Sequence, residues 1–213
     1  MQGLDITRLC VIILIGVSGL AETGCRQGTA DYRPFAAAEE MVCPDGAQRV
    51  EVRESSYPEF YCVGEEGRVG PWLEFDENGR LRKRAEYSHD KMNGSWEAYH
   101  PNGLVETRGQ MSDDKRTGVW VQYYVNGSLR SEKNYADNQL EGPIKLYYQD
   151  GRLMADGGFS AGIEEGKWRV YTPEGKLAKE CDLVHGEEKN CVVHEEGFKA
   201  STYVYESREL GPL

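Results

Sequence analysis

The 213-residue sequence lacks the basic clusters that proteins use to bind nucleic acids or anionic lipids. Lys and Arg number 25 against 36 Asp and Glu, which gives a formal net charge of -11. A nucleic-acid partner needs a basic stripe that neutralises its phosphates, and an anionic lipid surface repels a chain of this sign. An acidic surface mainly keeps a protein soluble. We therefore expect no nucleic-acid partner.

Catalytic motifs are also missing. The sequence has no Gly-x-x-x-x-Gly-Lys phosphate loop, and neither His89 nor His100 has a Ser or Cys partner in a recognisable motif. Acidic pairs such as Asp113-Asp114 fall in expected loops, where solvated turns commonly use them. We predict a protein that is not an enzyme and that holds no cofactor and no metal.

The sequence has one long hydrophobic run, and it stands near the N-terminus. Leu9–Ala21 spans 13 residues with no charge. A helix of that length rises about 20 Å, short of the ~30 Å hydrocarbon core of a bilayer. The run is therefore typical of a signal peptide, which we assign to residues 1–24. A short buried segment is the alternative.

The residues after this run resemble a bacterial lipoprotein cleavage site. Gly24 fits that pattern, in which the following Cys25 becomes the acylated N-terminus, whereas Glu22 departs from it. The resemblance implies a lipid anchor at Cys25 in the bacterial envelope. Cleavage after Ala21 is the alternative, and it would release a soluble secreted protein.

Four further cysteines form two well-separated pairs. Cys43 and Cys62 flank the N-terminal part of the chain, and Cys181 and Cys191 flank its C-terminal part. In an exported chain such pairs indicate disulfides, so we predict one disulfide within each pair. The alternative for the second pair is a zinc site, whose ligands would be Cys181, His185, Cys191 and His194.

The body of the protein repeats with a period of 24 residues. Five glycines mark equivalent positions: Gly70, Gly94, Gly118, Gly142 and Gly166. In each copy an Asn-Gly, Asp-Gly or Glu-Gly pair separates two apolar segments, which predicts a β-hairpin with a type I′ turn. Hairpins must stack on their neighbours to bury an apolar face. The sequence therefore predicts an all-β fold, an elongated antiparallel sheet of five tandem hairpins over residues 70–185.

The aromatic positions of the repeat define the expected core. The first strand carries Trp or Ile and, three residues later, Phe or Tyr, so strict alternation places the two on opposite faces unless a bulge intervenes or the second lies at the strand end. The second strand carries Leu or Val and another apolar residue six positions later, which predicts that both share a face. The expected core residues are Trp72, Trp96, Trp120, Ile144, Trp168, Phe75, Tyr99, Tyr123, Tyr147 and Tyr171. Tyr124 and Tyr148 occur in two copies only, and we predict that they form an exposed binding patch.

Less regular segments flank the repeats. Residues 25–41 show no strand alternation and predict a lipidated tether, with a short helix over Phe35–Met41 as the alternative. Residues 42–69 and 186–213 look like degenerate hairpins, and we assign them as the N-terminal and C-terminal caps, each with a disulfide cysteine.

The repeat Gly-x-Trp-x-x-Tyr-x-x-Asn-Gly-x-Leu resembles the MORN repeat in its bacterial variant form, which also occurs in YwqK-type antitoxins. The resemblance implies a twisted sheet of hairpins without catalytic machinery, used for scaffolding or protein binding. We expect an envelope lipoprotein that presents this surface to a protein partner, in one version an immunity or antitoxin-like role. The alternative is a carbohydrate- or cell-wall-binding module that uses exposed aromatic side chains, which would make a polysaccharide the partner.

Overall fold

The computed structural model describes residues 34–54 and 56–195. The predicted signal peptide, Cys25 and most of the tether lie outside the described residues, as do residues 196–213 of the predicted C-terminal cap. Among the helices of the described part, none is long and apolar enough to cross a membrane.

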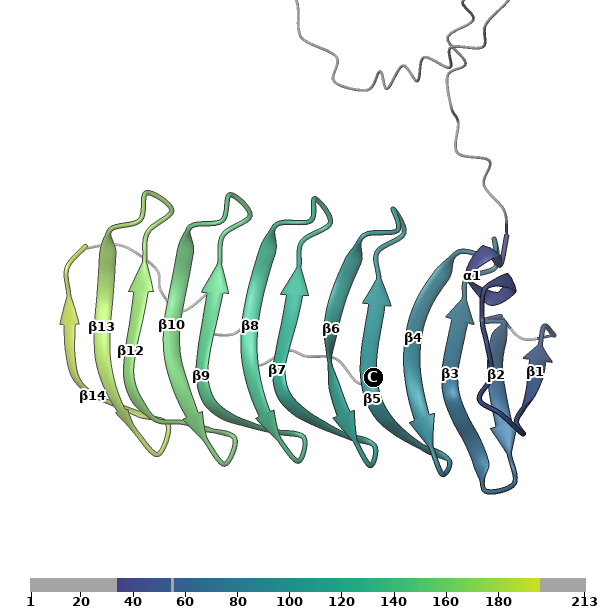
Figure 1. The fold of residues 1–213 in the computed structure, drawn as a ribbon. Helices are drawn as coiled ribbons and strands as arrows, with labels where there is room; N and C mark the ends of the chain where they lie inside the picture. The colour runs from purple at the N-terminus through teal and green to yellow at the C-terminus, as the bar shows by residue number, and fades with distance from the viewer. Residues whose placement is uncertain (1–33, 55, 196–213) are drawn as a thin grey trace, which may run out of the picture. The chain divides into compact units, whose positions relative to one another are not determined.

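The described chain forms one open antiparallel sheet (Figure 1), which confirms the all-β hairpin fold. Neighbouring strands in the sheet are neighbours in the sequence, except that the two-residue β11 lies off the main path beside β10. The strands are β1 (Gln48–Val52), β2 (Glu59–Gly64), β3 (Gly67–Phe75), β4 (Leu81–Ser88), β5 (Lys91–Tyr99), β6 (Val105–Ser112), β7 (Lys115–Tyr123), β8 (Leu129–Ala136), β9 (Gln139–Tyr147), β10 (Leu153–Ser160), β11 (Ile163–Glu164), β12 (Gly166–Tyr171), β13 (Leu177–Val184) and β14 (Glu187–Val193).

The Asn-Gly turns have a different geometry from the predicted type I′. Only the glycine adopts a positive φ, for example 84° at Gly127. The Gly127 N–H donates to the Tyr124 carbonyl and the Tyr124 N–H donates to the Ser128 carbonyl, both at 2.8 Å. This pattern is a type I turn closed by a glycine bulge. The hairpins were predicted correctly and their turn type was wrong, because the strand already ends one residue before the expected turn.

Turns with two successive positive φ values occur instead between the repeats, at the lower edge in Figure 1. The pairs are His89-Asp90, Asp113-Asp114, Asp137-Asn138, Ala161-Gly162 and His185-Gly186. Positive φ at both central residues is the requirement of a two-residue type I′ turn, which Asp and Asn tolerate. The segments expected as inter-repeat loops are therefore tight turns within a continuous meander.

β-Bulges decide which face each side chain occupies. Each hairpin has a register shift near its upper turn: in β8, Leu129 pairs with Tyr123 and Ser131 pairs with Gln122, which leaves Arg130 as the extra residue. The bulge turns Leu129 to the face of Tyr123 and leaves Tyr135 on the face of Trp120. The prediction that Leu129 and Tyr135 share a face is therefore wrong.

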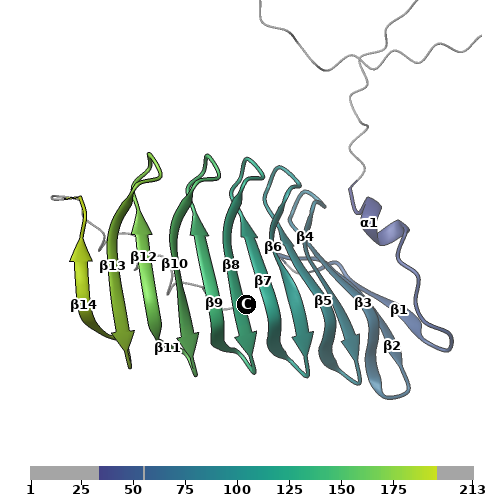
Figure 2. The same ribbon diagram turned by 60° about the vertical axis from the view of Figure 1, so that its left-hand side comes forward.

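The two faces of the sheet differ in character, and we name each by its side chains. The tryptophan face carries Trp72, Trp96, Trp120, Ile144 and Trp168, together with the buried residues Ala85, Tyr87, Met111, Tyr135, Ala155, Phe159 and Leu183. The ladder face carries the charged row described below and the four repeat tyrosines. Figure 2 shows the same sheet turned by 60°.

Residues 34–41, expected as the end of the tether, pack against the sheet. They include the short helix α1 (Ala36–Glu39), so the alternative of a helix in this segment agrees with the structure. Phe35 takes a left-handed conformation (φ 62°), and its N–H donates to the Gly79 carbonyl. Phe35 and Ala38 then cover an apolar cluster formed by Phe60, Leu73 and Phe75.

Both predicted disulfides are present. Cys43–Cys62 ties the segment after α1 to β2, and Cys181–Cys191 joins β13 to the edge strand β14. Cys181 and Cys191 also lie within 4.8 Å of a carboxylate oxygen of Glu188. Because both sulfur atoms are used in the disulfide, the zinc alternative loses two of its four ligands.

Candidate interaction surface

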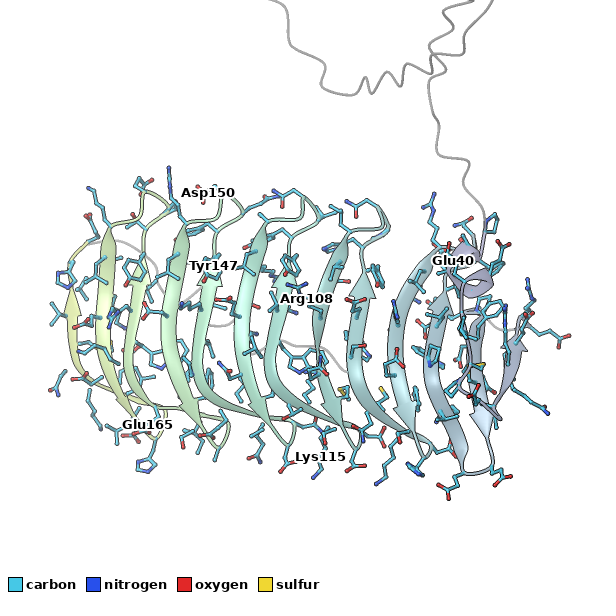
Figure 3. The ribbon with its side chains drawn as sticks, viewed as in Figure 1. Glu40, Arg108, Lys115, Tyr147, Asp150 and Glu165 are labelled. Atoms are coloured by element: carbon cyan, nitrogen blue, oxygen red, sulfur yellow. A yellow bond between two sulfur atoms is a disulfide. The ribbon has the colours of Figure 1, made fainter. Side chains whose placement is uncertain are left out.

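A single cross-strand row of mostly charged residues runs along the ladder face. Residues that pair directly in an antiparallel sheet lie on the same face, so the registers define the row. Its members, in order from β4 to β13, are Arg84, Glu97, Arg108, Val121, Glu132, Lys145, Asp156, Arg169 and Glu180. Opposite charges stand next to each other at almost every step. Figure 3 labels Arg108 on this face, in β6.

The ion pairs of this row are best formed near the C-terminal end. Arg169 lies 3.2 Å from both Asp156 and Glu180, and Lys167 lies 3.0 Å from Glu180. The Lys167 ammonium, and secondarily Arg169, lowers the pKa of the Glu180 carboxyl. These pairs are exposed, so they contribute little to stability and mainly fix where the charges stand.

A half-buried aromatic rim lies beside the charged row. Tyr99 and Tyr147 donate their hydroxyl groups to Glu97 and Glu132 of the row, the latter at 2.9 Å. Burial, and then this hydrogen bond to a carboxylate, raises the pKa of each tyrosine to about 12. The Arg108 guanidinium lies 5.5 Å from the centre of the Tyr123 ring. The rim tyrosines are therefore held in place by the ladder.

The repeat tyrosines occupy the face opposite the tryptophans, as strict alternation requires. They pair across the hairpin with an aliphatic residue: Tyr99 with Val105, Tyr123 with Leu129, Tyr147 with Leu153 and Tyr171 with Leu177. These tyrosines are partly exposed, whereas Phe75, the equivalent residue of the first repeat, is 1% exposed. The tyrosines thus form a surface rim and are not part of the buried core.

The first repeat shows what can cover this rim. Phe35 packs its ring 5.2 Å from that of Phe75 and 5.5 Å from that of Phe60. Leu81, the aliphatic partner of Phe75, contacts the same cluster. A short apolar segment from outside the repeats therefore occupies one copy of the rim, and four further copies follow it along the sheet.

Tyr124 and Tyr148, predicted as an exposed patch, are half-buried and connect the repeats. Tyr124 donates to the carbonyl of Tyr147, and Tyr148 donates to the carbonyl of Tyr171, both at 2.7 Å. His100, at the equivalent position of an earlier repeat, contacts the Tyr123 carbonyl in the same way. Because these polar groups hold the next repeat, the pair is a poor platform for stacking sugar rings.

On the tryptophan face, the rings lie across the preceding strand. Trp120 donates its indole N–H to the Gln110 carbonyl, and Trp168 donates to the Gly158 carbonyl, each at 3.2 Å. This position leaves no room beneath the ring: a Cβ on Gly109 would lie 2.2 Å from Trp120, and one on Gly157 would lie 2.2 Å from Trp168. Sequence reasoning overlooked these two glycines, although their separation by two whole repeat periods was a usable signal.

The exception at Ile144 has a counterpart on the preceding strand. Positions equivalent to Gly109 and Gly157 hold Ala85 in β4 and Lys133 in β8, and Lys133 pairs directly with Ile144. Lys133 is only 2% exposed. A long side chain at this position fills the space that an indole ring uses elsewhere. This explains why the fourth repeat has Ile where the others have Trp.

The geometry defines a class of protein: a β-hairpin repeat protein whose single sheet presents one apolar and one charged face. A family model described as MORN repeat variant matches residues 68–89, 116–137 and 164–189. The matched segments start two repeat periods apart, so the chain carries MORN-variant repeats as the resemblance implied. Among curated proteins, no relative matches the sequence.

Solved structures show only distant likeness. A Glycosylation Associate Protein (Gap123) complex from Streptococcus agalactiae aligns with 55% of this chain at 8% identity and a TM-score of 0.36. A TarM variant from S. aureus aligns with 66% at 14% identity and 0.24, and accessory secretory protein 1,2 and 3 from Streptococcus pneumoniae with 62% at 12% and 0.19. The chain spans about a fifth of the length of these proteins (22%, 20% and 20%).

Proposed function

We propose that this protein is a non-catalytic scaffold that binds a protein partner through the ladder face. The observation that carries the proposal is the segment around α1, which already fills the first copy of the aromatic rim with Phe35. Repeats two to five leave the same rim half-exposed. A partner segment with a ring or aliphatic side chain at intervals would dock along it.

The charged row would fix the register of such a partner. Its charges alternate in sign, so a partner with the opposite alternation gains pairing at each strand, whereas a shifted partner meets like charges. This surface suits a folded or extended protein better than a polysaccharide, which carries no such alternation. An immunity or antitoxin-like role is one version of this function.

The proposed location is the bacterial envelope, with a lipid anchor at Cys25. The two disulfides indicate an exported or extracellular protein, because thiols are kept reduced in the cytosol. The lipoprotein-like residues around Cys25 support the anchor. The intact mass of protein purified from envelopes tests it: a diacylglyceryl or larger lipid mass on Cys25 is expected, and a free Cys25 thiol would contradict the anchor.

Affinity capture from a detergent extract of the native envelope tests the binding role. Tagged residues 26–213 are expected to retain one stoichiometric protein in moderate salt. The double variant R108E/K145E, altered on the ladder face, should lose it. The matched control K91E/K115E changes the net charge equally at the lower edge, near Lys115 in Figure 3, and should retain it.

Two results would contradict the binding role. Equal loss in both variants would indicate a general charge effect, which is not what a docked partner requires. Retention of polysaccharide without any protein would favour the cell-wall-binding alternative, and glycan fragments are therefore analysed alongside proteins.

A further inference from the structure

The tryptophan face has no covering element among residues 34–54 and 56–195. Every described strand lies within the sheet, and α1 packs on the ladder face. In a single-layer sheet, ring stacking protects the edges of a side chain but leaves its outward side to water or to a covering segment. Yet the four tryptophans are 2% to 9% exposed and Ile144 is 1% exposed. An apolar face of this kind calls for a cover.

The same face carries a group of cations near its centre. Lys133 lies close to Arg116 and Arg130, and burial together with these two arginines lowers the pKa of Lys133 to about 8. The Arg116 guanidinium lies 5.0 Å from the Trp120 ring, and its Nε is buried without a hydrogen-bond acceptor among the described residues. A carboxylate placed here would offset the mutual repulsion of these cations.

A shallow pocket beside this group offers a place for an inserted side chain. Its lining combines apolar and polar residues: Gln122, Tyr124, Arg130, Ser131, Lys133, Leu146, Tyr147 and Met154. A ring or a carboxylate that enters here contacts the cation group directly.

The described chain ends by turning back toward the sheet. After β14 the N–H groups of His194 and Glu195 both donate to the Ala178 carbonyl in β13, at 2.8 and 3.3 Å. Glu195 also pairs with Lys176 at 3.6 Å. The chain therefore leaves the edge strand in the direction of the sheet interior, and residues 196–213 follow it.

Length and composition both fit residues 196–213 to the tryptophan face. Fully extended they span about 60 Å. Lys133 in β8 is four strands from β13, which is about 19 Å at the spacing of neighbouring strands. The segment contains the aromatic run Tyr203-Val204-Tyr205, followed by Glu206, Glu209 and a terminal carboxylate.

We propose that residues 196–213 fold back over the tryptophan face as a strap, with the aromatic run on the indole rings and an acidic group at Lys133 and Arg116. The strap completes the core from its own chain. It also closes this face to other molecules, so that the ladder face is the surface left for partners.

Protease protection in the full chain gives the first test. Trypsin cuts after Lys199 and Arg208 in a free segment, and docking removes these bonds from the protease. We expect cleavage at both sites at least about tenfold slower in the native protein than in a synthetic 196–213 peptide. Equal rates would overturn the proposal, and this measurement needs no variant to fold.

Truncation after Glu195 gives the second test. All four tryptophans lie on the covered face, so acrylamide quenching of their fluorescence should increase about threefold or more, and addition of the 196–213 peptide should reverse it. A peptide with Tyr203→Ser and Tyr205→Ser is the matched control and should not. Unchanged quenching, or a truncated chain that is dimeric in solution and as protected as the full one, would show another cover and contradict the strap.

Full-length E206K/E209K tests the role of charge. It should raise quenching and speed cleavage at Lys199, whereas the neutral pair E206Q/E209Q should have a smaller effect. No difference between the wild-type protein and E206K/E209K would overturn the part of the proposal that places an acidic group at Lys133.

Discussion

The two faces of this sheet are built by one 24-residue repeat and obey different rules. On the tryptophan face, a large ring in one strand requires a small residue in the strand before it, as Trp120 over Gly109 and Trp168 over Gly157 show. On the ladder face, neighbouring strands exchange charges, and half-exposed tyrosines lie along the rim. Close packing tolerates few substitutions, whereas exposed charges tolerate many. The tryptophan face thus specifies the fold, and the ladder face is free to specify a partner.

The largest effect is expected where the packing rule is broken. Gly157→Ala should lower the free energy of unfolding by about 3 kcal/mol, because its Cβ would lie 2.2 Å from Trp168. Gly158→Ala in the same strand is the matched control, since its Cβ would meet a backbone oxygen at 3.3 Å and both glycines have ordinary φ values. Urea unfolding followed by tryptophan fluorescence measures both. Similar losses for the two variants would contradict the packing rule.

The exceptional fourth repeat allows a test of the same rule in reverse. Ile144→Trp alone should destabilise the protein by about 2 kcal/mol, because the indole would compete with Lys133 for space. In the double variant with Lys133→Gly, the indole regains the arrangement of the other repeats. A double-mutant cycle should give a favourable coupling of at least about 1 kcal/mol. Simple additivity of the two substitutions would refute the link between Lys133 and Ile144.

The lower edge, where the two faces meet, gives a smaller effect. In the turn after β6, the Asp114 carboxylate accepts the Met92 N–H at 2.7 Å, and the Asp114 N–H donates to the Met92 carbonyl. Asp114→Asn keeps an acceptor, as Asn138 does for Arg116. Asp114→Ala should therefore cost about 1 kcal/mol and Asp114→Asn much less.

The neighbouring Asp113 provides the control for this turn. It makes an exposed ion pair with Lys91, so Asp113→Ala should change stability by less than about 0.5 kcal/mol beyond the effect of the alanine at a positive φ. Chemical denaturation of the three variants measures the order. If Asp113→Ala proves as costly as Asp114→Ala, the hydrogen bond between successive turns is not what stabilises the edge.

The sequence was sufficient for the architecture because the repeat signal is redundant. Five glycines at one interval, with Trp and Asn-Gly in phase, define hairpins whatever their detailed geometry. The positive φ values at Gly70 and its equivalents also follow from the residue type. The two disulfides followed from the spacing of four cysteines and the expectation of export.

Details that depend on a single extra residue could not be read in the same way. The bulge at Arg130 moves Leu129 to the other face, and nothing in a period-two pattern marks it. The roles of Tyr124 and Tyr148 required knowledge of the next repeat, because their hydroxyl groups bond to its backbone. The docking of Phe35 depends on contacts with rings that are distant in the sequence.

The smallest expected effect concerns protonation on the ladder face. The pKa of Tyr147 is raised to about 12 by burial and then by its hydrogen bond to Glu132, so its contribution to stability is complete below about pH 10 and is lost as the pH rises toward 12. Glu132→Gln removes the negative charge and should bring the titration of one tyrosine toward 10, as ultraviolet absorbance of tyrosinate measures. Stability at pH 7 should change by less than about 0.5 kcal/mol. A large loss of stability would mean that the ladder face, like the tryptophan face, holds the fold together.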